Sequence, residues 1–306
     1  MRGLNPRQIE AFRAVLLTGG VSSAAALMNV TQPAVSRMIR DLQRQLGLTL
    51  FERRGTGLVP TSEALSLYAE VERAFVGLDR IAQMATELRT RGAGFLRIAA
   101  LPALANGFLP RFVGHFLADR PKLDVVLSGL VSHAVVAAVA QGQCDLGFAE
   151  ASIEHAAVRH ERMPAARLVA VLPEGHRLAR RKRLQPRDFE GESFISLGHS
   201  SVSRFRIDRV FAAHGVNRIM RIETPLSEIA CSFAASGAGV TLCEPFTATE
   251  YATRGIVVRP FEPRVDFEFA ALSAAQRALP AVTREFIDAF RSHVAAFLRG
   301  GQSARP

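Results

Sequence analysis

The stretch SSAAALMNVTQPAVSRMIRDL, residues 22–42, decides how the first part of this chain folds. Ser22–Met28 predicts a short helix rich in alanine, whose small side chains let a second helix approach closely, and Asn29 ends it. The next helix begins at Thr31, a residue type that caps helices, and Pro33 lies in its first turn. Apolar side chains then recur at the spacing of one buried helical face: Val35, Met38, Ile39, Leu42 and Leu46.

The opposite face of this second helix carries side chains that suit DNA. Glutamine can bond adenine at two points and arginine can bond guanine, and the N-terminal residues of such a helix meet base edges. The arginines could equally bind phosphates, which fix the position on the duplex without reading its sequence. We expect the DNA contacts of this helix to come from Thr31, Gln32, Pro33, Ser36, Arg37 and Arg40.

The flanking residues complete a small module. Upstream, the sequence predicts a helix that begins near Pro6 and ends at Gly19. Downstream, Leu48–Pro60 holds two short extended runs around a turn rich in glycine and arginine, which predicts a β-wing with Arg53 and Arg54 placed for backbone or minor-groove contact. A basic, solvated hairpin on a small helical domain is the alternative, but the order of the elements favours DNA binding.

Positive charge is concentrated in this module. The 306-residue chain has a net charge of +10, and residues 1–60 hold eight arginines against Glu10, Asp41 and Glu52, an excess of 8 − 3 = +5. Half of the excess therefore lies in a fifth of the chain, which favours a polyanionic partner.

Composition and cysteine placement exclude several classes of protein. The three cysteines (Cys144, Cys231 and Cys243) lie far apart in the sequence, and no histidine is at metal-ligand spacing from them, so we expect reduced thiols, no metal and no cofactor. The N-terminus lacks an apolar signal core, and no apolar stretch is long enough to span a membrane. We expect a cytoplasmic protein.

A long helix is predicted from Thr61 to about Arg91, because no proline interrupts this stretch. Apolar residues alternate by four and three along it, with Val71 and Leu78 shared by two overlapping seams. About thirty residues give a rod of roughly 45 Å. A lone helix cannot cover such a stripe, so it either pairs with its twin in a second copy or packs on its own protein's core. Arg89–Gly94 predicts a hinge.

From residue 95 onward, short apolar strands alternate with helices, which predicts α/β structure with parallel sheets and helices on both faces. The expected strands cover 95–101, 123–127, 144–149, 168–173, 194–197, 220–224, 240–243, 256–258 and 267–272. The expected helices cover 107–119, 132–141, 203–214, 227–236, 245–253 and 283–298. Ligands of such sheets bind at the carboxyl ends of the strands.

The run from Leu4 to Pro60 resembles the winged helix-turn-helix of LysR-type bacterial transcription regulators, above all in residues 22–42 and in LGLTLFERR, Leu46–Arg54. At Gln43, where members commonly have glutamate, we expect only a lost surface charge. The resemblance covers essentially the whole chain. It implies an all-α winged helix-turn-helix over 1–60, a linker and dimerisation helix over 61–94, and a two-lobed effector domain like periplasmic binding proteins over 95–300.

The first lobe would hold about 95–164 and 266–300, and the second about 165–265. Four phrases look similar to LysR itself and to the opine regulators: LRIAALPAL (96–104), DLGFAE (145–150), LPEGHRLA (172–179) and FEGESFISL (189–197). Those regulators answer to diaminopimelate or to amino-acid conjugates such as octopine and nopaline. The resemblance also implies promoter DNA, RNA polymerase and further copies of the chain, as a homodimer or homotetramer, as partners.

The effector is expected between the lobes, where Glu150 suits an ammonium group and is awkward for an aromatic acid. Family members often carry a hydroxyl at about Ala103, which this chain lacks. A carboxylate would be held by hydroxyls and backbone N–H groups in the second lobe. A surface or capping role is the alternative for each residue taken singly. The expected effector residues are Pro102, Ala103, Leu104, Asn106, Ser132, His133, Glu150, Ser196, His199, Ser200, Ser201, Ser203, Arg206 and Thr224.

Catalytic motifs are incomplete. Gly198–Val202 lacks the last glycine of a hydrolase nucleophile elbow, and Gly237–Gly239 lacks the third glycine of a dinucleotide loop. We therefore expect no enzyme. The basic run Arg177–Arg183 predicts a solvated loop, with additional DNA contact as the alternative. A solute-binding protein or an enzyme built on the same two lobes, and a regulator that senses an aromatic or organic acid, are the competing interpretations.

Overall fold

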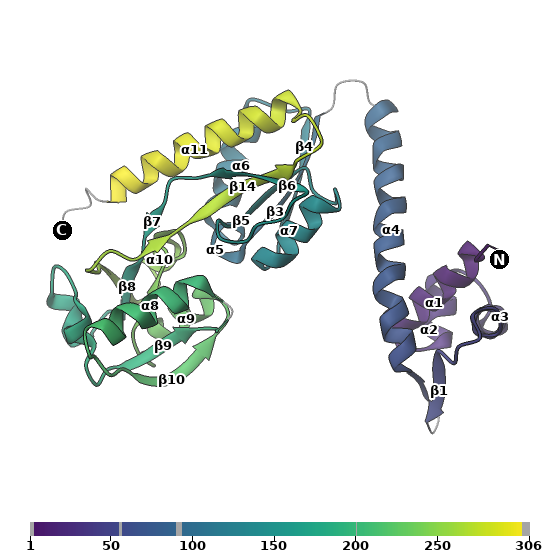
Figure 1. The fold of residues 1–306 in the computed structure, drawn as a ribbon, viewed down its shortest axis with the longest axis horizontal. Coiled ribbons are helices and arrows are strands. Elements are labelled where there is room, and N and C mark those ends of the chain that lie inside the picture. Colours follow the sequence, from purple (N-terminus) through teal and green to yellow (C-terminus); the bar gives the residue numbers. More distant parts are fainter. Residues whose placement is uncertain (1–2, 55–56, 90–93, 200, 302–306) are drawn as a thin grey trace. The chain divides into compact units, whose positions relative to one another are not determined.

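The computed structural model describes residues 3–54, 57–89, 94–199 and 201–301 (Figure 1). The chain divides into two compact units, Met1–Arg89 and Thr90–Pro306. The turn of the expected wing at 55–56 and most of the expected hinge at 89–94 lie outside the described residues.

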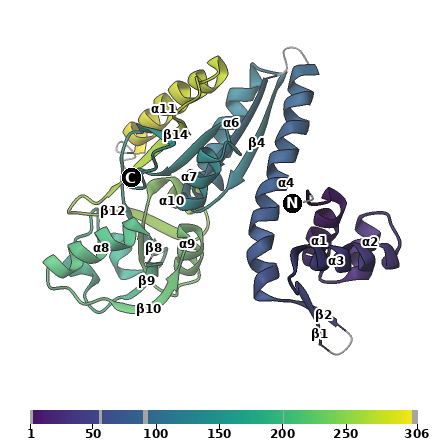
Figure 2. The ribbon, with the colours of Figure 1, turned by 45° about the vertical axis from the view of Figure 1, so that its right-hand side comes forward.

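The first unit is a trio of helices followed by a hairpin and a long helix. Its elements are α1 Pro6–Thr18, α2 Val21–Leu27, α3 Gln32–Leu46, β1 Phe51–Arg54, β2 Gly57–Pro60 and α4 Ser62–Arg89. Phe12, Val35 and Leu42 are buried where α1–α3 meet. The Asn5 side chain accepts a hydrogen bond from the Arg7 N–H at 3.0 Å and so caps α1. The antiparallel pair β1–β2 projects beyond the helices (Figure 2).

Gln43 corrects an expectation, because its side chain is a structural brace. Its Oε1 accepts hydrogen bonds from the backbone N–H groups of Leu50 at 2.7 Å and Phe51 at 3.1 Å. The side chain therefore ties α3 to the start of β1, and it is only partly exposed. A glutamate would offer the same acceptor oxygens, so the requirement at this position is for an acceptor.

The apolar stripe of helix α4 is covered mainly in its first half, and its described residues are exposed in its second half. Ala64 and Val71 are buried in the core of the first unit, and Leu67, Tyr68 and Phe75 pack against that core. Farther along, Leu78 and Ile81 are 55% and 67% exposed. The first half of the stripe thus packs on its own protein, while the described apolar residues of the second half are uncovered.

The second unit begins with a five-stranded sheet in the order β4-β3-β5-β14-β6. Helices α6 and α11 cover one face, where phenylalanines pack together, and α7 covers the other (Figure 1). Its elements are β3 Gly94–Ala100, α5 Pro102–Ala105, α6 Phe108–Ala118, β4 Leu123–Gly129, α7 Ser132–Ala140, β5 Leu146–Glu150, β6 Val158–Arg162, β14 Phe269–Ala274 and α11 Ala281–Gly301. We call this set the first lobe.

The second lobe holds the sheet β11-β8-β12 and the parallel pair β10-β9. An isolated bridge joins Phe194 of β9 to Val240, the residue directly before β11. Its elements are β8 Val169–Pro173, η1 Arg177–Arg180, η2 Pro186–Phe189, β9 Ser193–Leu197, α8 Val202–Ala213, β10 Ile219–Thr224, α9 Ser227–Ala235, β11 Thr241–Cys243, α10 Pro245–Tyr251 and β12 Ile256–Pro260. Two short strands, β7 Ala166–Arg167 and β13 Asp266–Phe267, pair antiparallel where the chain passes between the lobes.

Two expectations about strands were wrong. The five-stranded sheet is mixed, because β14 pairs antiparallel with β5 and β6, and the sheet β11-β8-β12 is antiparallel throughout. Parallel pairing holds for β4-β3-β5 and β10-β9. Strand β6 was not expected at all. It is an edge strand whose sequence is VRHER and of which only Val158 is buried, so no apolar run marks it.

The brace at Gln43 gives a stability prediction. Gln43→Ala removes the acceptor of two backbone N–H groups, and leaving such groups unpaired costs about 1–3 kcal/mol of unfolding free energy. Gln43→Glu keeps an acceptor oxygen and should cost much less. Urea unfolding of the full chain, followed by circular dichroism, measures both. The brace is refuted if Gln43→Ala unfolds like the wild type.

Candidate functional site

The exposed face of α3 presents a polar surface backed by a buried one. Val35, Ile39 and Leu42 anchor the helix in the core. Gln32 donates to the Ser36 hydroxyl at 3.2 Å, and the Arg40 Nε donates to the Ser36 carbonyl at 3.3 Å. These side chains are thus aligned along one side of the helix by contacts within it.

The other predicted DNA-binding residues flank this polar surface. Arg37 is exposed and its Nε lies 3.7 Å from Asp41. Thr31 is the N-cap of α3 without a capping hydrogen bond from its side chain, and Pro33 is exposed in the first turn. Arg53 and Arg54 lie on β1 of the wing. Arg13, by contrast, donates to Glu72 of α4 at 2.6 Å and stacks over Phe75, so its charge serves the fold.

A cavity of about 210 Å³ opens between the two lobes of the second unit. Seven of the expected effector residues line it: Pro102, Ala103, Ser132, His133, Glu150, Ser201 and Ser203. Further lining residues, which were not expected, are Leu101, Val131, Ile153, Leu197, Pro225, Leu226, Ser227, Glu244 and Phe267. Ser203 is 5% exposed.

Glu150 is the last residue of β5, and its side chain reaches across the cleft to α8. Its backbone N–H donates to the Ser132 hydroxyl at 3.2 Å, and its carboxylate accepts a hydrogen bond from the backbone N–H of Val202, in the first turn of α8. Burial raises the pKa of the Glu150 carboxyl, against the opposite effect of that hydrogen bond and of the Arg206 and His133 charges. Glu150 therefore belongs to the first lobe by sequence and is bonded to the second.

Glu244 is the second carboxylate of the cavity wall. It follows β11 and is 2% exposed. The Ser227 hydroxyl donates to its Oε2 at 2.8 Å, and the Thr247 hydroxyl donates to its Oε1. Burial raises the pKa of Glu244 to about 7, against the effect of these hydrogen bonds. Sequence patterns missed it because it stands between a buried strand and Pro245, where a helix-capping role accounts for an acidic residue.

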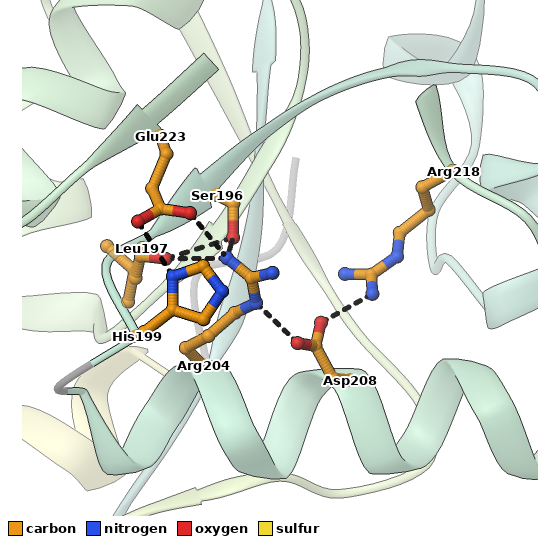
Figure 3. Close-up of polar contacts among 7 residues, drawn as sticks. All are labelled: Ser196, Leu197, His199, Arg204, Asp208, Arg218 and Glu223. Carbon is orange, nitrogen blue, oxygen red and sulfur yellow. Dashed lines mark hydrogen bonds and ion pairs between the residues drawn. The ribbon is translucent and has the colours of Figure 1, made fainter. Parts of the chain in front are cut away.

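Arg204 holds the turn that carries the serines of the second lobe (Figure 3). From α8 its guanidinium reaches the Leu197 carbonyl at 2.9 Å and also bonds the Ser196 hydroxyl and Asp208. Arg218 donates to Asp208 at 2.6 Å and lies over the Phe211 ring at 4.0 Å. Burial would raise the pKa of Asp208, but the two guanidiniums outweigh it and hold that pKa below its ordinary value.

Several expected effector residues are absent from the cavity wall and make other contacts. The Ser196 hydroxyl is occupied by Arg204, and the buried Thr224 hydroxyl accepts the Leu226 N–H at 3.4 Å. His199 is 78% exposed and bonds Glu223 at 2.9 Å (Figure 3). Arg206 bonds the Asp266 carbonyl and Glu268.

The remaining expected positions in the first lobe also lie off the wall. Leu104 is fully buried in the core. Asn106 bonds Glu228 of the second lobe at 2.5 Å, beside a smaller cavity of about 90 Å³. Ser200 lies outside the described residues. Strand-end position alone could not separate these residues from the lining ones, because it does not show which side chains the neighbouring arginines engage.

Other features of the described residues bear on the competing interpretations. No helix among them is long and apolar enough to cross a membrane, and no group of metal-ligating side chains is found there. In the basic run, Arg177, Arg181 and Arg183 pair with acidic side chains. Cys231 and Cys243 are free thiols whose sulfur atoms lie 3.7 Å apart, although they are twelve positions apart in the sequence.

Two family patterns match the chain. "Bacterial regulatory helix-turn-helix protein, lysR family" matches residues 6–65, and "LysR substrate binding domain" matches residues 89–295. The full-length regulator CbnR has the same fold, both free and in a crystal structure with its target DNA. Each comparison gives a TM-score of 0.78 and covers 94% of this chain and 99% of CbnR, at 17% and 18% identity.

Relatives match over nearly their whole length. The octopine catabolism/uptake operon regulatory protein OccR of Rhizobium meliloti is 43% identical, with 97% of this chain and 99% of OccR covered. The regulatory protein NocR of Agrobacterium fabrum is 39% identical, over 92% and 94%. The transcriptional activator protein LysR of Escherichia coli is 36% identical, over 97% and 94%. These relatives are regulators and not enzymes, and the chain belongs to the LysR family of DNA-binding bacterial transcriptional regulators.

Proposed function

We propose that this regulator senses an amino acid or an amino-acid derivative, such as a basic amino acid or an opine, in the cleft between its lobes. One observation carries the proposal: Glu150, a half-buried carboxylate, lies in the cleft against the N-terminus of α8. The similarity to OccR, NocR and LysR supports the same class of effector.

The charges on the two sides of the contact between Glu150 and α8 are complementary to the ammonium and carboxylate groups of an amino acid. Glu150 supplies a negative charge, and the first turn of α8 supplies N–H groups that a helix does not pair internally, with the Ser201 and Ser203 hydroxyls beside them. An α-amino acid placed between the two would give its ammonium to Glu150 and its carboxylate to α8. The ligand would thereby replace a contact between the lobes with two of its own.

An effector that bears only acidic groups fits this cleft less well. Among the cavity-lining residues that the structure describes, Glu150 and Glu244 are acidic and His133 is the single ionisable base. A carboxylate without an accompanying ammonium group would meet like charge there, and it would have to displace Glu150 from α8 without compensating it.

DNA binding by this regulator is proposed to run through the exposed face of α3 and the wing. Gln32 and Ser36 would face base edges, whereas Arg37, Arg40, Arg53 and Arg54 would contact bases or phosphates. We further propose that α4 pairs with its twin, since the exposed Leu78 and Ile81 need a cover. A dimer, assembling to a tetramer, would act on promoter DNA in the cytoplasm, and effector binding would change DNA bending and the recruitment of RNA polymerase.

Gln32→Ala and Arg40→Ala should weaken DNA binding in different ways if α3 binds in the major groove. Gln32→Ala should weaken discrimination at one operator base pair by about 1–3 kcal/mol, because a paired donor and acceptor are lost. Arg40→Ala should weaken binding to all sequences and lower the salt dependence by about one phosphate contact. Titrations of operator and scrambled DNA at several salt concentrations measure both.

Arg209→Ala is the matched control for these titrations, because it removes one exposed positive charge from α8 in the other unit. It should leave both the salt dependence and the discrimination unchanged. Equal losses in Arg209→Ala and Arg40→Ala would mean that net charge, and not α3, governs the binding.

Glu150 gives a prediction about pH. Its ionised form binds the ammonium group, so affinity for an amino-acid effector should fall on acidification, beginning at a higher pH than for an ordinary glutamate because its pKa is raised. Glu150→Gln should lower the affinity about 10- to 100-fold and remove the share of this pH dependence that Glu150 contributes, leaving the share from Glu244. Thermal shifts with lysine, arginine, ornithine, diaminopimelate, octopine and nopaline measure it.

Organic acids without an amino group should give the opposite result in the same thermal-shift measurement. They should stabilise Glu150→Gln more than the wild type, because the first turn of α8 is then free of a competing carboxylate. Glu174→Gln, an exposed glutamate in a turn, should behave as the wild type with every ligand. An unchanged response of Glu150→Gln to amino acids, or a wild-type response to organic acids alone, would refute the amino-acid proposal.

A further inference from the structure

Glu244 is a buried carboxylate whose charge the described part of the protein leaves uncompensated. It lines the cavity while being 2% exposed. Within the described residues no arginine, lysine or histidine lies within ion-pair distance of it, whereas the other glutamate of the cleft has Arg206 and His133 nearby. The charged group that does act on Glu244 is Glu228, which carries the same sign. Buried charges in proteins are ordinarily paired.

The neighbours of Glu244 hold it in place without neutralising it. Ser227 and Thr247 each donate one hydroxyl hydrogen bond, to different carboxylate oxygens. Because an ionised carboxylate can accept about four hydrogen bonds, it retains capacity on the side of the cavity. The burial that raises its pKa to about 7 means that a positive charge brought beside it would stabilise the ionised form.

We propose that Glu244 is a specificity-determining residue that binds a second cationic group of the effector. Glu150 ends β5 of the first lobe and Glu244 follows β11 of the second, and both face the same cavity. A ligand with an α-ammonium group at Glu150 and a side-chain ammonium or guanidinium at Glu244 would contact a carboxylate in each lobe. The inference rests on the proposed amino-acid effector and narrows it to amino acids, or their conjugates, with two cationic groups.

Matched pairs of ligands test this inference on the wild-type protein. Lysine and norleucine differ in the side-chain ammonium group, and ornithine and norvaline differ in the same way, with arginine as a third dibasic probe. Calorimetric titration of the full chain should show each dibasic ligand binding about 10- to 100-fold more tightly than its monoamino partner, as expected for one charge-assisted hydrogen bond. Equal affinities within both pairs would overturn the inference without any variant.

Substitutions then separate recognition from structural support. Glu244→Gln should abolish the preference for dibasic ligands, so that the two members of each pair bind with nearly equal affinity. If Glu244 only caps α10, Glu244→Gln will weaken both members of a pair equally, and the inference fails. Ser227→Ala, which removes one support of the carboxylate, should give a smaller loss confined to the dibasic ligands.

Glu150→Gln distinguishes failure of this inference from failure of the proposed function. It should weaken dibasic and monoamino ligands alike, because both carry the α-ammonium group. If Glu150→Gln has this effect and the pairs still bind equally, the amino-acid effector stands and the role of Glu244 is refuted. If no amino acid binds, or if Glu150→Gln changes nothing, the proposed function is refuted and this inference with it.

Discussion

The paired strands β7 and β13 are the constraint on which the cleft between the lobes depends. The chain passes from one lobe to the other there and returns, so each lobe keeps its own sheet while both sheets face one gap. The polar residues of the cavity wall accordingly follow or end strands: Ser132 and His133 after β4, Glu150 at the end of β5, Ser201 and Ser203 after β9, Ser227 after β10 and Glu244 after β11. Strand ends expose backbone and side-chain groups that no ladder engages, which is why ligands of such sheets bind there. Separation of the two lobes would divide this set of groups into two incomplete halves.

The polar contacts around the cleft differ between its two walls. In the second lobe, Arg204 fixes the carbonyl of Leu197 and with it the turn that presents the serines, while Arg218 and Asp208 hold Arg204 in turn. Polar contacts between the lobes include Arg111 with Glu250, Asn106 with Glu228, and Glu150 with α8. Arg206 of α8 also pairs with Glu268. The second-lobe wall is therefore held by a network within that lobe, whereas the polar contacts between the lobes involve partly exposed side chains, which contribute little individually. A buried contact between the lobes is aromatic, since Phe246 of α10 packs on Phe108 of α6 with ring centroids 4.7 Å apart. A ligand with differential affinity for the closed arrangement can shift such a balance.

Sequence patterns predicted the elements well where burial follows a regular period. Val35, Ile39 and Leu42 marked the buried face of α3, and apolar runs marked β3, β5 and β8. They did not predict β6, whose edge position leaves it polar, or the antiparallel placement of β14, which depends on the path of the chain. In the candidate site, position after a strand predicted Glu150 and Ser203, but not that Arg204 occupies Ser196 or that His199 bonds Glu223. Glu244 was missed because its burial arises from Ser227 and Thr247 packing around it, and such contacts between distant segments leave no local pattern.

The amide of Gln43 has a mechanical consequence for the DNA-binding unit. By accepting both the Leu50 and the Phe51 N–H groups, it locks the C-terminal part of α3 to the first strand of the hairpin. The helix and the start of β1 are thereby coupled through two backbone hydrogen bonds to one side chain. A displacement imposed on α3 would therefore be passed on to the start of the hairpin, and not be absorbed between the two.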